Sequence, residues 1–240
     1  PPGCTRSYAE MAERIGRLER RMQTILRIAS VEGEVFTAEV VARVLTTNEE
    51  ETLSSLSSDL YRKHHLISAH SIQRHDGRLI SSYRFRNILV QRYLYNSLDE
   101  VERVHMHEQV GAALEQLFPQ PEKSSPVIPQ LARHFEEAGI AEKAIHYLLL
   151  AGERAQQMSA YQEAIVMLSR GVDLLQKQPD PEKFAAQELK LQISLASSLQ
   201  GTWASPHQNI EQAFTRAREL CKNTGGADQL CQVMSGLAIV

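Results

Sequence analysis

Residues 66–85, LISAHSIQRHDGRLISSYRF, decide the fold of the first half of the chain. β-Branched, aromatic and other apolar residues recur with a period of two in residues 66–74 and again in residues 79–85. Asp76 and Gly77 lie between these runs, and both residue types tolerate the positive φ that a tight hairpin turn requires. The stretch therefore predicts a β-hairpin.

The sequence before this hairpin has a helical period. Apolar residues three and four apart predict helices over residues 8–29, 38–45 and 49–64. Gly16 leaves open whether the first range is one helix or two short ones. Thr37 and Asn48 precede the other two helices, and we expect their side chains to accept hydrogen bonds from orphan amides there.

Helical periodicity returns after the hairpin. We expect helices over residues 88–97 and 99–118, the second with an apolar stripe of Val101, Val104, Leu114 and Phe118. Helices that precede a hairpin at this scale are typical of a winged helix. Residues 119–129 then contain four of the nine prolines, a composition that indicates a linker.

The distal part repeats itself. Residues 141–148, AEKAIHYL, align with residues 161–168, YQEAIVML, at an offset of twenty. Small residues such as Gly152, Ala164 and Gly171 would let antiparallel helices approach, as in a tetratricopeptide repeat. Further helices are expected at residues 182–199, 209–222 and 228–240, with a turn at 223–226.

These patterns predict a mainly α fold in three parts. They are a winged-helix module with a short β-hairpin over residues 1–118, a linker over 119–129 and an α-solenoid of tetratricopeptide-like helix pairs over 130–240. Because the chain starts Pro-Pro-Gly and stops within an apolar-periodic segment, we expect a piece of a longer protein. Residues 227–240 would then leave an apolar surface that either frays or is covered by self-association in a homo-oligomer.

Composition narrows the setting. The net charge of −3 provides no global attraction to nucleic acid or an anionic membrane. No apolar run is long enough for a transmembrane helix, and no signal-peptide pattern occurs. Cys4, Cys221 and Cys231 are odd in number and lack CxxC spacing, which favours a reducing, cytoplasmic location.

The motif search favours a non-enzyme. The sequence contains no GxxxxGK[ST] loop, GxGxxG, GxSxG or HExxH motif, so no catalytic residue or bound cofactor is assigned. His134 and His146 fall on consecutive helices and could meet, but no further ligand completes a metal site. His107, near Gly111, is interpreted as a packed or half-buried histidine.

Basic residues gather around the hairpin. Residues 61–92 hold seven of them and one acid, Asp76, which gives a local charge of +6. Arg62, Lys63, Arg74 and Arg78 would contact DNA if this were a DNA-binding transcription regulator with a repeat dimerisation tail. The acidic run at residues 49–51 would occupy the base-reading turn and repel phosphate, so we rank this hypothesis second.

Several stretches resemble bacterial STAND-type signalling ATPases over nearly the whole chain. Residues 13–18, ERIGRL, and 28–36, IASVEGEVF, are similar to the region that follows their ATPase core. YRFR and QRYLY, at residues 83–86 and 91–95, are similar to the end of their winged helix. The stretches that resemble their tetratricopeptide tail are ARHFEEAG at 132–139, AGERA at 151–155 and TRARELC at 215–221.

The resemblance implies a non-catalytic regulatory segment. In such proteins an effector, often a class III adenylate or guanylate cyclase or a transcription-regulator domain, precedes a P-loop ATPase that binds ATP or ADP with Mg²⁺. The winged helix gates this ATPase domain, and the repeats bind a protein partner or a small inducer in their groove. DNA and membranes are not the expected partners.

The resemblance also implies one site. A histidine commonly follows the Phe-Arg of the winged-helix motif and touches the phosphate of bound nucleotide. In this sequence Asn87 stands at that place, after Phe85 and Arg86. Arg86 and Asn87 are therefore the expected phosphate contacts, although asparagine donates a hydrogen bond without carrying charge.

Overall fold

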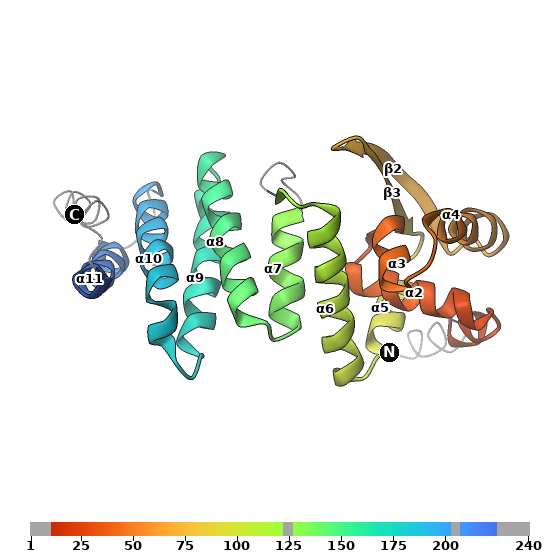
Figure 1. Cartoon of the computed structure of the whole chain (residues 1–240), viewed down its shortest axis with the longest axis horizontal. Coiled ribbons are helices and arrows are strands. Elements are labelled where there is room, and N and C mark those ends of the chain that lie inside the picture. The colour runs from red at the N-terminus through yellow and green to blue at the C-terminus, as the bar shows by residue number, and fades with distance from the viewer. Residues whose placement is uncertain (1–10, 122–126, 203–206, 225–240) are drawn as a thin grey trace, which may run out of the picture. The chain divides into compact units, whose positions relative to one another are not determined.

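The computed structural model describes residues 11–121, 127–202 and 207–224 (Figure 1). These residues are mainly helical and include one small three-stranded antiparallel sheet. The chain divides into two compact units, Pro1–Pro119 and Gln120–Val240. None of the described helices is both long and apolar enough to cross a membrane.

The first unit mixes helices and strands. A helical turn at residues 11–16 comes first, followed by α2 (Arg20–Glu32), β1 (Val35–Thr37), α3 (Ala38–Val44), α4 (Glu49–Ser54), the π-helix η1 (Ser55–Lys63), β2 (Ile67–His75), β3 (Arg78–Phe85), α5 (Ile88–Asn96) and α6 (Glu100–Leu117). The break between residue 16 and α2 favours the two-helix alternative for residues 8–29.

The predicted hairpin is confirmed. β2 and β3 pair antiparallel, and the turn between them has positive φ at Asp76 (46°) and Gly77 (81°), as a two-residue hairpin turn requires. The register shifts between Ala69 and Ser71, so β2 carries a bulge there. Figure 1 shows the two strands as a long arm beside α3 and α4.

A third strand, β1, was not predicted. Val35–Thr37 pairs with Arg84–Ser82 on the outer side of β3 and gives the order β1-β3-β2. Three residues are too few to show a period of two, so the pattern search could not find them. β1 buries Phe36, whose ring centroid lies 5.3 Å from that of Phe85 and 6.1 Å from that of Tyr83. These rings form the aromatic centre of the unit.

The side chain of Glu39 continues the sheet where β1 stops. α3 begins directly after Thr37, so no further β1 residue can pair with β3. Both oxygens of the buried Glu39 carboxylate accept from the backbone N–H of Ser81, at 3.0 Å each. The carboxylate thus satisfies a strand amide that would otherwise be orphaned.

Polar side chains cap three helices of this unit. Asn48 accepts from the Glu50 N–H at 2.8 Å, which confirms that prediction, and Asn87 accepts from the Leu89 N–H at 2.9 Å. Asp99 and Glu102 form a reciprocal capping box at the start of α6. The predicted Thr37 cap is wrong: its hydroxyl makes no cap hydrogen bond, because Thr37 is the last residue of β1.

The helix predicted over residues 49–64 changes type along its length. α4 ends at Ser54, and η1 continues with wider turns, so that the His64 N–H reaches the Asp59 carbonyl at 2.8 Å. The apolar spacing places Leu53, Leu56 and Leu60 on one face; Leu56 and Leu60 are buried, whereas Leu53 is half-buried and Thr52 is buried.

The predicted stripe on α6 is only half right. Leu114 and Phe118 are buried, whereas Val101 and Val104 are 66% and 37% exposed. The buried face runs instead through His107, Val110 and Ala113. The burial of His107 agrees with its interpretation as a packed histidine, whereas Val101 and Val104 were wrongly assigned to the stripe.

The second unit is helical throughout its described residues. Its elements are α7 (Val127–Glu137), α8 (Ala141–Gln157), α9 (Tyr161–Gln176), the 3₁₀-helix η3 (Pro181–Phe184), α10 (Ala185–Gln200) and α11 (His207–Thr224). Each long helix packs on the next, from α7 to α11 (Figure 1). The predicted linker was drawn too long, because residues 127–129 belong to α7. Proline is tolerated in a first helical turn, where no intrahelical donor is needed.

Small residues permit close helix contacts in this unit. A Cβ placed on Gly152 of α8 would lie 2.5 Å from Leu168 Cγ of α9, and one on Gly171 would lie 2.8 Å from Leu191 Cδ2 of α10. Ala164 is fully buried in the same core. Ala164 and Gly171 are therefore packing positions, as the sequence predicted.

The last predicted features lie at the edge of the described chain. α11 runs through Thr224, so the turn expected at residues 223–226 does not begin at Asn223. The helix expected over residues 228–240, and the apolar surface assigned to residues 227–240, lie outside the described residues.

Candidate functional site

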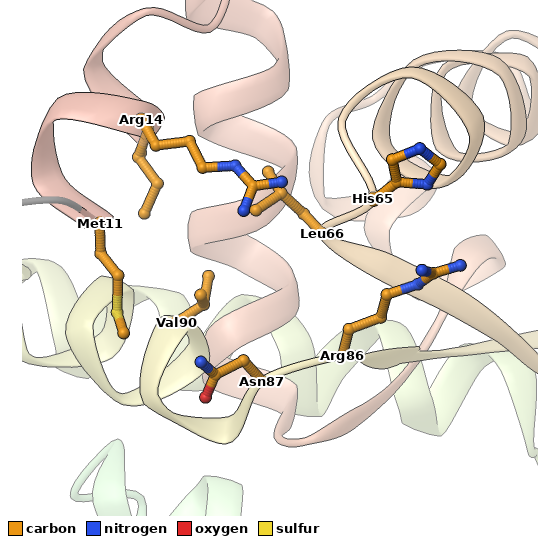
Figure 2. A pocket seen from close by; sticks show the side chains of 8 residues that line it. Met11, Arg14, His65, Leu66, Arg86, Asn87 and Val90 are labelled. Carbon is orange, nitrogen blue, oxygen red and sulfur yellow. The ribbon is translucent and has the colours of Figure 1, made fainter. Parts of the chain in front are cut away.

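A cavity of about 340 Å³ lies in the first unit (Figure 2). It forms where the helical turn at residues 11–16 meets the start of β2 and the junction of β3 with α5. Its described lining consists of Met11, Arg14, Ile15, His65, Leu66, Arg86, Asn87 and Val90. Arg86 and Asn87, the two residues singled out from the sequence, therefore border one cavity.

Arg86 is held in place by the neighbouring strand and ring. Its backbone N–H donates to the Leu66 carbonyl at 3.0 Å, and its Nε donates to the Ile67 carbonyl at 3.1 Å. Its Cζ lies 5.5 Å from the ring centroid of Tyr61, within cation–π range. These contacts fix the guanidinium without neutralising its charge.

Arg14 brings a second guanidinium from the opposite wall. It donates to the backbone carbonyl of His64, just after η1 ends. The next residue, His65, has a left-handed φ of 52°, which turns the chain from η1 into β2. In Figure 2 the Arg14 side chain reaches toward Leu66, whereas Arg86 extends toward the His65 side.

Asn87 has a structural task as well as a place on the cavity wall. Its Oδ1 caps α5 by accepting from the Leu89 N–H. With the oxygen so engaged, the amide NH₂ is the group that remains to serve a ligand. Asn87 can therefore add a neutral donor to the site.

The cavity is suited to an anion. It has two guanidiniums, a capping amide and a histidine, and none of its described lining residues is acidic. Ile15, Leu66 and Val90 are buried and provide an apolar floor, whereas Arg14, His65, Arg86 and Asn87 are exposed to solvent. Planar guanidiniums match phosphate and carboxylate oxygens, so the arrangement favours binding such a group.

The four residues of the DNA hypothesis do not form one cluster. Arg62 and Lys63 are exposed at the end of η1, whereas Arg74 and Arg78 are exposed at the tip of the hairpin. β2 separates the two pairs by roughly 23 Å, at ~3.3 Å per strand residue. Arg78 also borders a hollow that contains Glu39 and Glu49.

The acidic start of α4 is held by arginines of the same unit. Glu49 lies 3.6 Å from Arg43, and Glu51 accepts a hydrogen bond from Arg21. That hydrogen bond lowers the pKa of Glu51, so its carboxylate remains charged at neutral pH. A phosphate backbone approaching α4 would meet these fixed carboxylates.

The histidines have separate surroundings. His107 is buried and its Nε2 lies 3.0 Å from the Tyr95 hydroxyl, which confirms that it is a packed histidine. His134 is buried and His146 is exposed. Within the described ranges no group of three or more His, Cys, Asp or Glu side chains is placed to hold a metal ion.

The sequence did not identify Arg14 and His65 as site residues. Arg14 lies fifty positions before His64, and neither a motif nor a periodicity relates such distant residues. A bias toward basic residues was visible around the hairpin, but the residues named from it, Arg62, Lys63, Arg74 and Arg78, do not line the cavity.

Comparison with known proteins adds one distant relative. An uncharacterized protein of Rhizobium meliloti (strain 1021), R02095, is 24% identical over 218 residues, which are 88% of this chain and 20% of that protein. The chain thus spans about a fifth of the length of the relative that it matches. No family model matches the chain, and no solved structure matches it.

Proposed function

We propose that the chain is a non-catalytic regulatory segment of a larger STAND-type signalling ATPase. The first unit would be a winged helix that gates the ATPase domain, and the second a tetratricopeptide-like array that binds a partner or inducer. The cavity at the junction of β3 and α5 carries this proposal. It gathers Arg86, Asn87 and Arg14, with no acid in the described lining, at the place where the resemblance implies a phosphate contact.

The element order supports the winged-helix assignment. α3 and the helix formed by α4 and η1 precede the β2–β3 hairpin, and β1 adds the third strand. The repeat assignment rests on α8 and α9, whose sequences align at an offset of twenty and whose contact depends on Gly152. The length of R02095 is compatible with further domains beside such a segment.

The cavity residues fit a nucleotide phosphate better than a magnesium ion. Arg14 and Arg86 would bind phosphate oxygens, and the Asn87 amide would donate a third hydrogen bond. Mg²⁺ prefers carboxylate and water oxygens, and the described lining offers no carboxylate. Bound ATP would provide the γ-phosphate whose hydrolysis drives the switch, while this chain would only sense the phosphate.

Gating would follow from differential contact. Arg14 belongs to the helical turn before α2, and Arg86 to the end of β3. A phosphate that binds both arginines would stabilise the observed arrangement of the helical turn and β3. Loss of the phosphate would allow the two elements to move apart. A ligand shifts such an equilibrium only through its different affinity for the two states.

The endogenous polypeptide tests the proposal directly. An antibody against this chain should recover a protein whose peptides include a GxxxxGK[ST] loop and which releases ADP or ATP on denaturation. An endogenous polypeptide without a phosphate-binding loop would contradict the assignment.

The isolated chain offers a second test. Pyrophosphate should shift the backbone amide resonances of Leu66 and Arg86, and Arg86→Ala should abolish the shifts. Arg62→Ala, an exposed arginine outside the cavity, is the matched control and should leave them unchanged. The chain itself should not turn over ATP. Turnover that survives repurification and is lost with one substitution in this chain would show that it is an enzyme.

The alternative is a DNA-binding winged-helix regulator with a repeat dimerisation tail. The exposed Arg74 and Arg78 at the hairpin tip favour it, and the carboxylates at the start of α4 oppose it. Labelled duplex DNA titrated at two salt concentrations decides between the proposals. Tight binding with a steep salt dependence, abolished by Arg74→Ala with Arg78→Ala, would make the DNA hypothesis the better one.

A further inference from the structure

The hollow that Arg78 borders in the first unit has a volume of about 490 Å³. α3 and α4, the first half of β3 and the end of α6 contribute its lining. The described lining combines two acids, two bases, three leucines and a serine, which are Glu39, Glu49, Arg43, Arg78, Leu53, Leu79, Leu117 and Ser81. It shares no described residue with the cavity at the junction of β3 and α5, so the two sites are separate.

Two of the four charges in this hollow compensate each other. The Arg43 guanidinium lies 3.6 Å from the Glu49 carboxylate, and its Nη1 also lies 3.5 Å from the Glu39 backbone carbonyl. Arg43 is thus held between α3 and α4, and its pair with Glu49 adds no net charge to the hollow. The electrostatic preference of the hollow therefore depends on the other two charged side chains, Glu39 and Arg78.

Glu39 is a buried acid without a cationic partner. It is 3% exposed, and among the described residues the Ser81 N–H is the only group that is hydrogen-bonded or ion-paired to its carboxylate. A carboxylate has about four acceptor sites, and a buried charge in a protein is normally compensated by an opposite charge. Glu39 therefore keeps both acceptor capacity and an uncompensated negative charge for a cationic group that enters the hollow.

Arg78 provides the opposite charge. It is exposed at the start of β3, and none of the described carboxylates forms an ion pair with it, since Glu49 pairs with Arg43 instead. Arg78 and Glu39 line the same hollow without pairing with each other. The hollow thus presents one unpaired charge of each sign to two different groups of a ligand.

The remaining lining is apolar. Leu117 is buried and Leu53 is half-buried, whereas Leu79 is 52% exposed. An exposed leucine leaves apolar surface in water, and covering that surface with another apolar group is favourable. A ligand of this hollow would therefore gain affinity from an aliphatic side chain as well as from its two charges.

We propose that this hollow binds a free α-amino acid with an aliphatic side chain. The ammonium group of the amino acid donates to the Glu39 carboxylate, and its carboxylate accepts from the Arg78 guanidinium. Its side chain contacts Leu79 and the neighbouring leucines. A phosphate would leave Glu39 uncompensated, and a metal ion would leave Arg78 unused, so a zwitterion fits the two charges better than either. This site goes beyond the proposed function and does not depend on it.

Ligand analogues provide the first test, with L-leucine as the probe in calorimetric titrations of the full chain. Leucinamide keeps the ammonium group and the side chain but lacks the carboxylate. 4-Methylpentanoate keeps the carboxylate and the side chain but lacks the ammonium group. We expect each analogue to bind about tenfold more weakly than leucine, because each loses one charge-assisted interaction. Glycine, which lacks the side chain, should also bind more weakly.

Glu39→Gln provides the second test, because glutamine keeps an oxygen that can accept from the Ser81 N–H and removes only the charge. It should weaken leucine binding about tenfold. The same substitution should leave the binding of 4-methylpentanoate nearly unchanged, because that analogue has no ammonium group. A substitution that merely disturbed the fold would weaken both ligands alike.

Arg78→Gln keeps the test decisive even if Glu39→Gln were unstable. Arg78 is exposed, so this variant should fold normally and weaken leucine binding several-fold. Arg74→Gln is the matched control, because it removes an exposed arginine from the same hairpin tip outside the hollow and should bind leucine as the wild type does.

The outcomes separate the possibilities. No binding of leucine, isoleucine, valine or methionine at millimolar concentration would overturn the site. Leucinamide that binds as tightly as leucine would make the hollow an amine site and overturn the zwitterion. Leucine binding that is insensitive to both Glu39→Gln and Arg78→Gln would place the ligand elsewhere. Each of these failures leaves the phosphate-binding loop of the endogenous polypeptide unaffected, so the proposed function is tested independently.

Discussion

The two units of this chain fix their helices by different means. In the first unit, Asn48, Asn87 and Asp99 cap the helices α4, α5 and α6 through side-chain hydrogen bonds. In the second unit, α8, α9 and α10 begin without any side-chain cap. There the helices are positioned by close contacts at Gly152, Gly171 and Gly201.

This difference predicts which substitutions destabilise each unit. A cap acts on its own helix end and contributes about 1 kcal/mol. A glycine at a helix crossing sets the distance between two helices, so a larger residue there disturbs both. We therefore expect substitutions of small residues to destabilise the second unit most, and substitutions of the polar residues at helix N-termini to destabilise the first unit most.

The largest effect is expected for Gly152→Leu. The new side chain would overlap Leu168, which is fully buried and has no free direction in which to move. The free energy of unfolding should fall by about 3 kcal/mol, measured by urea denaturation. Gly16→Leu is the matched control, because a Cβ at Gly16 meets nothing within 4 Å. Equal losses for the two variants would mean that helix crossing distance is not what Gly152 provides.

Asp99→Ala should have the next largest effect. It removes the half of the capping box in which the Asp99 side chain accepts from the Glu102 N–H, and it leaves the residue-99 backbone N–H that donates to the Glu102 side chain. The expected loss is about 1 kcal/mol in the same urea experiment. Glu100→Ala removes an equal charge from the same helical turn without touching the cap, and should cost only a few tenths of that. If both variants lost the same stability, charge rather than capping would be responsible.

Gly201→Ala should cost less than about 1 kcal/mol, although it also creates a close contact. A Cβ there would lie 2.7 Å from the ring of Tyr161. Tyr161 is only half-buried, so its ring can shift where Leu168 cannot. Thermal unfolding of Gly201→Ala and Gly152→Leu should be compared. The difference measures how much of the stability loss arises because Leu168, unlike Tyr161, cannot move aside. A loss as large as that of Gly152→Leu would contradict this explanation.

The smallest effect on stability is expected for Asn87→Asp. Aspartate keeps the acceptor that caps α5, so the free energy of unfolding should stay within about 0.5 kcal/mol of the wild type. The new carboxylate would nevertheless enter the cavity with Arg14 and Arg86 and weaken pyrophosphate binding, followed by amide resonance shifts. Asn48→Asp makes the same substitution at a cap outside the cavity and should leave pyrophosphate binding intact. Unchanged binding in Asn87→Asp would remove Asn87 from the site.

Features that depend on residues close together in the sequence were predicted correctly. The hairpin turn at Asp76 and Gly77 and the cap at Asn48 depend on residues within a few positions of each other, and both were predicted correctly. β1 was missed because its three residues acquire meaning only through pairing with β3. The first turns of α6 were misassigned, because apolar spacing alone placed Val101 and Val104 on the buried stripe although both are exposed.

The candidate site shows the same difference between residues that are adjacent and residues that are distant in the sequence. Arg86 and Asn87 were proposed through a resemblance, and they are adjacent in sequence. Arg14 and His65 join them only because the chain folds back over some fifty positions, and the hydrogen bond from Arg14 to the His64 carbonyl leaves no trace in the sequence. The sequence could therefore name part of the cavity but could not assemble it.

The Glu39 carboxylate also affects the tendency of the protein to aggregate at high concentration. An unpaired amide on the outer side of a strand is a template on which a strand of another molecule can add, and such additions begin aggregates. The two carboxylate oxygens of Glu39 occupy the Ser81 amide just where β1 ends. A foreign strand would have to displace a buried carboxylate before it could extend the sheet there. The Ser81 amide is thus paired although β1 is short, and Glu39→Ala should aggregate sooner than wild type even where both are equally folded.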